Sequence, residues 1–118
     1  MTMKASSRRV DGITILDLSG RITLGEGSGL LREQIRDLVG KGEKKILLNL
    51  GDVAYIDSSG IGALVNAFTT VREQGGELKL LNLPRKVNDL LQIAKFFKIF
   101  DVNDVKDDET SALKAFTK

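Results

Sequence analysis

The sequence predicts an α/β fold, in which a mainly parallel sheet of four to five strands carries an N-terminal antiparallel hairpin strand and about four helices accompany it. The first reason is that apolar runs of strand length alternate with segments whose apolar residues recur every three or four positions. Short connections join them, as is typical of right-handed strand–helix–strand crossovers. The second reason is size, because a chain of 118 residues buries about two-thirds of its unfolded surface, enough for one core. We therefore expect one domain over residues 1–118.

The first half of the chain predicts a hairpin, a helix, a buried strand and a second helix. Asp11 and Gly12 favour a two-residue hairpin turn before a strand at 13–19. The first helix is expected to begin at Thr23, because Glu26 follows at the spacing of a capping box. Its apolar face is expected to consist of Leu31, Ile35, Leu38 and Val39. The helix is expected to end at Gly40 and Gly42. A buried strand at 46–50 is expected to end in a polar turn at Gly51 and Asp52.

The second half continues the same alternation. A second amphipathic helix is expected after residues 57–60, with apolar positions at Ile61, Leu64, Val65, Phe68 and Val71 and a stop at Gly75 and Gly76. Residues 77–82 predict a strand and 84–94 a third helix, with Val87, Leu90, Leu91 and Ala94 buried. A last strand is expected near 98–101. The acids at 107–109 then suit the start of a final helix that buries Ala112, Leu113 and Phe116.

The composition excludes the commonest catalytic chemistries. The chain has no histidine and no cysteine, so it has no Ser-His-Asp or Cys-His catalysis, no zinc site of the usual kind and no disulfide. Carboxylates remain available for hydrolysis. We expect a protein that is not an enzyme and that uses no cofactor and no metal.

The charge and apolar patterns predict a soluble cytoplasmic protein without membrane or direct nucleic-acid partners. No apolar run approaches the ~20 residues of a membrane span. The net charge is +2, and the densest basic stretch, 41–45, is interrupted by Gly42 and Glu43. Aromatic residues make up only 5%, so a solvated turn explains that stretch better than a surface that tracks phosphates.

The segment with the most chemical content is the junction between the buried strand and the second helix. There Asp57, Ser58 and Ser59 precede Gly60 and Gly62. In open α/β sheets such strand-to-helix junctions display functional groups, and the first turn of a helix tolerates an added anion. The simpler interpretation is that Asp57 or Ser58 caps the helix and that the glycines allow close packing.

Residues 53–64, with Asp57-Ser58-Ser59-Gly60-Ile61-Gly62 at their centre, resemble the signature of the STAS family, specifically the stand-alone bacterial anti-sigma factor antagonists. The resemblance extends along nearly the whole chain. It implies that a partner that is both serine kinase and anti-sigma factor phosphorylates Ser58, with Ser59 as the alternative acceptor. It further implies that the unmodified form binds this partner and releases a sigma factor, and that a metal-dependent serine phosphatase resets the switch. Partner-binding residues would be Thr23, Asp57, Ser58, Ser59, Gly60, Ile61 and Gly62.

The sequence also departs from this family. Position 23 is commonly an acid or its amide there, whereas Thr23 carries no charge. Two other functions stay open: a STAS scaffold or accessory subunit that is not phosphorylated, in a stress-sensing or transport assembly, and an enzyme or nucleotide-binding protein. Against the last, Gly25, Gly27 and Gly29 are spaced differently from the glycines of a dinucleotide loop. We expect a monomer or a weak homodimer.

Overall fold

The chain begins with the expected hairpin, as seen in a computed structural model that describes residues 3–25, 27–85, 105–106 and 108–116. Strands β1 (Lys4–Val10) and β2 (Ile13–Ile22) pair antiparallel from Val10 and Ile13 outward. Asp11 and Gly12 both have positive φ angles, 53° and 79°, the conformation of a two-residue turn that matches the twist of the strands.

The sheet has the predicted mixed character. Strand β3 (Lys45–Ile56) pairs parallel with β2, β4 (Glu77–Leu81) with β3, and β5 (Val105–Lys106) with β4, giving the order β1-β2-β3-β4-β5. The third helix predicted at 84–94 and the strand predicted near 98–101 lie largely or wholly outside the described residues. The α/β class is confirmed.

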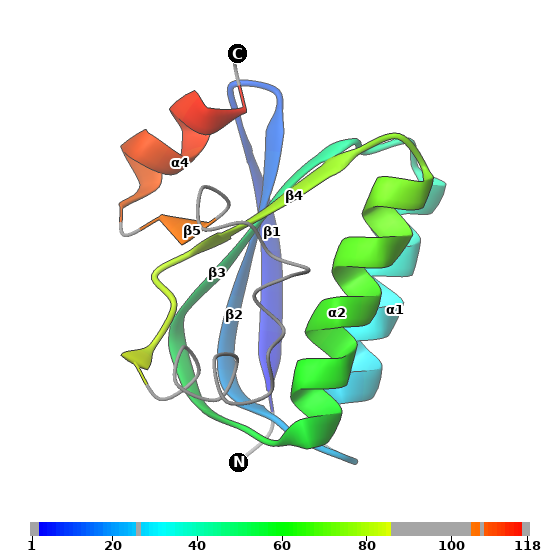
Figure 1. The fold of residues 1–118 in the computed structure, drawn as a ribbon, viewed down its shortest axis with the longest axis vertical. Helices are drawn as coiled ribbons and strands as arrows, with labels where there is room; N and C mark the ends of the chain where they lie inside the picture. Colours follow the sequence, from blue (N-terminus) through cyan, green and yellow to red (C-terminus); the bar gives the residue numbers. More distant parts are fainter. Residues whose placement is uncertain (1–2, 26, 86–104, 107, 117–118) are drawn as a thin grey trace.

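Among the described residues, two helices cover one face of this sheet, and another lies on the opposite face (Figure 1). Helices α1 (Ser28–Gly40) and α2 (Ser58–Glu73) pack side by side, and α4 (Glu109–Ala115) lies across the sheet from them. Within the described residues, no helix is long and apolar enough to cross a membrane.

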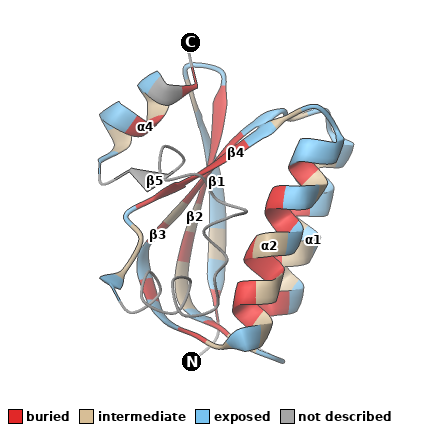
Figure 2. Cartoon of the chain, in the orientation of Figure 1, coloured by how far each residue is buried: buried red, intermediate tan, exposed pale blue. Residues whose placement is uncertain are grey.

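The alternation of side chains along the strands builds a core on each face (Figure 2). The larger core joins α1 and α2 to the sheet, and its members include the predicted Leu31, Ile35, Leu38, Ile61, Leu64, Phe68 and Val71. Val39 and Val65, also predicted, are partly buried and pack against it. The smaller core lies beneath α4 and consists of Ile13, Ile15, Leu47, Leu81, Ala112 and Phe116.

The predicted turn at Gly51 and Asp52 is wrong, because β3 continues through these residues to Ile56. Its pairing with β2 shifts register twice, once between Asp17 and Ser19 and once between Gly20 and Arg21. Each shift places an extra residue on β3, which is how a bulge accommodates residues that do not fit a regular ladder. The strand therefore reaches the start of α2 directly.

The predicted start of α1 at Thr23 is also wrong. The helix begins at Ser28, and Gly27 precedes it without a side-chain cap. The Thr23 carbonyl instead accepts hydrogen bonds from the amides of Gly27 and Ser28, at 3.1 and 3.2 Å. Gly25 has a φ of +85°, and a Cβ on Gly27 would overlap the Arg21 carbonyl. The glycines thus form a tight turn against β2, a conformation that glycine adopts at low cost. Glu26 lies outside the described residues.

Candidate functional site

Asp57 connects β3 to α2 and caps the helix. Its Oδ1 accepts a hydrogen bond from the Gly60 amide at 2.9 Å, and its own carbonyl accepts one from the Ile61 amide at 3.0 Å. Aspartate is among the preferred residues for this position because its short side chain reaches amides that have no partner within the helix. Of the two caps that the sequence left open, Asp57 or Ser58, the structure has Asp57, and the helix begins at Ser58, earlier than the expected start after residue 60.

The second carboxylate oxygen of Asp57 holds a different part of the chain. Oδ2 accepts a hydrogen bond from the amide of Leu24, at 3.2 Å, in the loop between β2 and α1. Hydrogen bonds from backbone amides, that of Gly60 above all and then that of Leu24, lower the pKa of Asp57 below its ordinary value of 3.8. The carboxylate is therefore ionised at neutral pH and joins the two loops at this end of the sheet.

The two serines that follow are in different environments. Ser58 is exposed, and its hydroxyl has no hydrogen-bond partner among the described residues. Ser59 is half-buried, and its hydroxyl donates to the Ser28 hydroxyl at 2.9 Å, which links the first turns of α2 and α1. A reagent from solution therefore meets the Ser58 hydroxyl first.

The remaining predicted residues divide between packing and surface. Gly60 is buried, and a Cβ there would overlap the Ile22 carbonyl and the Ile56 side chain, so the helix approaches the sheet closely at this point. Ile61 is 5% exposed and belongs to the larger core. Gly62 is half-buried, and Arg32 Nη2 lies 3.7 Å from the position that a Cβ on Gly62 would take.

Thr23 reaches the site through its position in the β2–α1 loop. It is half-buried, and the next residue, Leu24, is the one bonded to Asp57. The structure therefore brings the loop at 23–24 to the start of α2, although Thr23 does not cap a helix.

Sequence reasoning missed three exposed side chains at this end of the sheet. Leu24 is 80% exposed and Tyr55 is 48% exposed, and they are the two large apolar residues with high exposure in the described part of the chain. Arg21 pairs with Tyr55 on the neighbouring strand, and its guanidinium lies 5.2 Å from the centre of the ring. The signal in the sequence was an isolated leucine among glycines, outside every apolar repeat.

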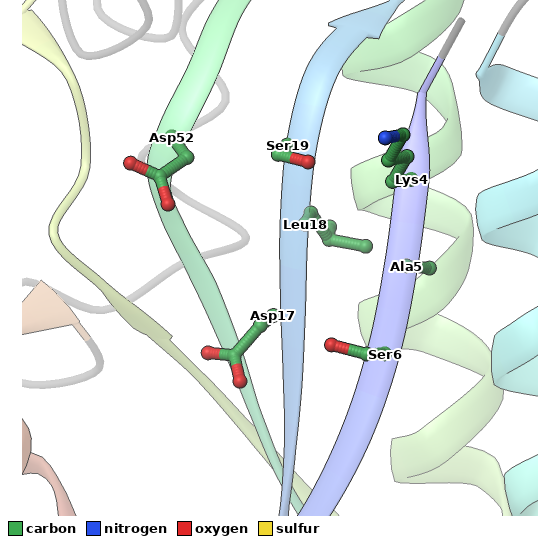
Figure 3. A pocket seen from close by; sticks show the side chains of 7 residues that line it. All are labelled: Lys4, Ala5, Ser6, Asp17, Leu18, Ser19 and Asp52. Atoms are coloured by element: carbon green, nitrogen blue, oxygen red, sulfur yellow. The ribbon is translucent and has the colours of Figure 1, made fainter.

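A separate pocket lies on the sheet face opposite α1 and α2, where β1, β2 and β3 are side by side (Figure 3). Its polar lining comes from Lys4, Ser6, Asp17, Ser19 and Asp52. Asp17 is already bonded to Arg8 and Asn49, and the hydrogen bond from Arg8 is the main reason that its pKa is lowered. The described residues contain no group of three acids, histidines or cysteines that could hold a metal.

Comparison with known proteins agrees with this architecture. The profile of the STAS domain family matches residues 4–112. BtrV of Bordetella bronchiseptica, provisionally named an anti-sigma factor antagonist, is 30% identical over 112 residues, which cover 95% of this chain and 96% of BtrV. The anti-sigma-B factor antagonist of Bacillus subtilis is 38% identical over 74 residues, 63% of this chain and 67% of that protein. The crystal structure of TM1081 from Thermotoga maritima, with the same provisional name as BtrV, has a TM-score of 0.85 at 24% identity and covers 97% of this chain and 95% of its own.

Proposed function

Because the chain belongs to the STAS domain family and its relatives are named anti-sigma factor antagonists, we propose that it binds an anti-sigma factor and that phosphorylation of Ser58 switches this binding off. In the unmodified form it occupies the anti-sigma factor, which releases a sigma factor to act in the cytoplasm. The anti-sigma factor is also the serine kinase. This chain is its substrate and binding partner rather than an enzyme.

The observation that supports Ser58 as the switch is the contrast with Ser59. Ser58 is exposed and its hydroxyl is free of partners among the described residues, whereas Ser59 is bonded to Ser28. In the modification, the Ser58 oxygen takes the terminal phosphoryl group of ATP, ADP leaves, and the hydroxyl proton is lost. A metal-dependent serine phosphatase hydrolyses the ester with water, which restores the hydroxyl and releases inorganic phosphate.

Charge explains why the modification would end binding. A phosphate adds about −1.5 to −2 charges, comparable in size to the net charge of +2 of the whole chain. It would lie directly beside Asp57, which is ionised. Burying such an anion unpaired in an interface costs several kcal/mol, and each ~1.4 kcal/mol lowers affinity tenfold.

The fold would survive the same change. Ser58 is in the first turn of α2 and exposed, and an anion at the start of a helix is stabilised by roughly 0.3–1 kcal/mol. Phosphorylation would therefore act on the interface and leave the domain folded.

Leu24, in the loop bonded to Asp57, and Tyr55, two residues before Asp57, are both exposed and would supply apolar contacts to the partner. Large side chains in the centre of an interface contribute most of its affinity. The Asp57 carboxylate fixes the backbone of Leu24 relative to the first turn of α2. The partner would therefore contact this loop and Ser58 together.

The test is phosphorylation by the cognate kinase, with ATP, of the wild-type chain and of Ser58→Ala and Ser59→Ala. Fragment-ion mass spectrometry of the tryptic peptide that carries both serines identifies the modified residue. We expect one phosphate on the wild type and on Ser59→Ala and none on Ser58→Ala. If the kinase phosphorylated Ser59 in the Ser58→Ala variant, the proposal that Ser58 is the acceptor would be overturned.

Binding to the same partner tests the switch itself. We expect Ser58→Asp to bind at least tenfold more weakly than the wild type. Ser6→Asp places the same charge on an exposed position of β1 and serves as the matched control, with unchanged affinity. Equal affinity of Ser58→Asp, phosphorylated protein and wild type would overturn the proposal.

A further inference from the structure

The side chain of Arg32 reaches from α1 to the surface of α2. The two helices contact each other along their length, and at their first turns Ser28 and Ser59 are hydrogen-bonded. One turn further along α1, Arg32 Nη2 lies 3.7 Å from the position that a Cβ of Gly62 would take. The guanidinium therefore lies over Gly62, where no side chain separates it from the helix surface.

Ser58 lies one turn before Gly62, on the same face of α2. Residues four apart on a helix have Cβ atoms about 5–6 Å from each other. A phosphate extends three bonds beyond the Cβ of a serine, and the arginine side chain rotates about several bonds of its own. A phosphate on Ser58 is consequently within reach of the Arg32 guanidinium without movement of either helix.

The charges around Arg32 favour an added anion. No carboxylate forms an ion pair with Arg32 among the residues that the structure describes. Arg36, one turn further along α1, brings a second cation to that side. The one acid next to Ser58, Asp57, has its oxygens engaged by the amides of Gly60 and Leu24. Arginine forms paired hydrogen bonds with phosphate through its planar group.

We propose that Arg32 binds the phosphate of phosphorylated Ser58 and closes an ion pair between α1 and α2. This inference rests on the proposed modification of Ser58. Gly62 serves it by leaving the surface between the two groups open. The phosphate would then be held in place on the domain by a single cation, and because it carries about −1.5 to −2 charges the pair would keep a net negative charge that still opposes burial in the interface.

The test is the second ionisation of the phosphate, followed by phosphorus NMR across a pH titration. Phosphoserine is installed at position 58 during translation, so neither kinase nor partner is needed. The second pKa of a free phosphoserine is about 6, and a neighbouring cation lowers it. In the wild type we expect the second pKa of the phosphate to lie about half a unit or more below 6. In Arg32→Gln we expect this pKa to return towards 6.

Two further variants separate a direct contact from a general charge effect. Arg36→Gln removes the same charge one turn away and should shift the titration much less. Arg32→Lys keeps the charge and should retain part of the shift. Melting temperatures of the unphosphorylated variants, expected to equal that of the wild type, show that the fold is intact.

Equal phosphate titrations in the wild type and Arg32→Gln would overturn the inference. So would a larger effect of Arg36→Gln than of Arg32→Gln. Because the phosphoserine is installed directly, this outcome is independent of whether a kinase modifies Ser58, and the two proposals can fail separately.

Discussion

The Asp57 carboxylate accepts a hydrogen bond from the amide of Leu24, which precedes it by 33 residues, while its other oxygen accepts one from Gly60, three residues ahead. One ionised side chain thus fixes the β2–α1 loop to the first turn of α2. A substitution that removes only one of the two carboxylate oxygens therefore separates the helix cap from the bond to the loop.

We predict that Asp57→Ser keeps much of the helix cap and loses the bond to Leu24, because a serine offers a single oxygen. Asp57→Ala should lose both and lower the free energy of unfolding by about 1 kcal/mol. Hydrogen exchange of the Leu24 amide, measured by NMR, should accelerate in both variants. Asp108→Ser, at the matched cap of α4 where Asp108 accepts from the Ser111 amide, should leave the Leu24 amide protected. Unchanged exchange of Leu24 in Asp57→Ser would contradict the predicted clamp.

Leu24→Ala should weaken binding of the anti-sigma factor about tenfold, since a truncated interface anchor costs more than 1 kcal/mol. The side chain is exposed, so the melting temperature should hardly change. Isothermal titration calorimetry measures the affinity. Thr69→Ala, at an exposed position of α2, is the control. Full affinity of Leu24→Ala would remove this loop from the interface.

The two glycines of α2 should respond to alanine in opposite directions. Gly60→Ala forces a methyl group onto the Ile22 carbonyl and should cost about 1–3 kcal/mol of unfolding free energy. Gly62→Ala meets only an ordinary contact with Arg32, and removing a glycine from a helix gains about 0.5–1 kcal/mol. Urea unfolding of the two variants and the wild type measures these changes in the free energy of unfolding. Similar stabilities would mean that α2 does not approach β2 as closely as described.

Acid should destabilise the protein through Asp57 and Asp17. Both carboxyls have pKa values lowered in the folded state, Asp57 by backbone amides and Asp17 chiefly by Arg8. A lowered folded pKa contributes stability that is present above the unfolded pKa, near 3.8, and is lost as the pH falls through the folded pKa. The urea concentration at the unfolding midpoint should therefore decrease as the pH is lowered below about 5. In Asp57→Asn this midpoint should decrease less steeply with falling pH than in the wild type. An equal pH dependence in the two proteins would exclude Asp57 as a contributor.

Apolar contact should hold α4 to the sheet more strongly than its ion pair does. Phe116 is 2% exposed in the smaller core, and Phe116→Ala should cost about 3–5 kcal/mol. The Arg8–Glu109 pair is 42% and 38% exposed, and Arg8→Gln should cost less than about 1 kcal/mol. Chemical unfolding measures both. A comparable loss in Arg8→Gln would show that the network of Arg8 with Asp17 and Glu109 is stronger than exposed pairs usually are.

The strands and helices could be predicted where local pattern decides them. The turn at Asp11 and Gly12 and the helix cap at Asp57 are short-range signals, and the apolar repeat of α2 marks its buried face without reference to the rest of the fold.

The features that the sequence did not predict correctly depend on contacts between distant parts of the chain. α1 begins at Ser28 rather than Thr23 because the glycine turn is shaped by its contact with Arg21 on β2. The strand beyond Gly51 persists because β2 continues to pair with it across two bulges. The difference between Ser58 and Ser59 depends on Ser28, 31 residues away, which no local pattern contains.

Strands that neighbour each other in the sheet are also consecutive in the sequence, from β1 to β5. As the chain leaves the ribosome, each of these five strands finds its partner already made, and none of the strands that the structure describes has to be inserted between two that have paired. The parallel pairs join residues such as Thr14 with Ile46 and Leu80 with Val105, 32 and 25 residues apart, and pairing with the preceding strand keeps these separations and their loop-closure entropy lower than pairing with a more distant strand would. The sheet can therefore be assembled in the order of synthesis, growing outward from the N-terminal hairpin along one edge.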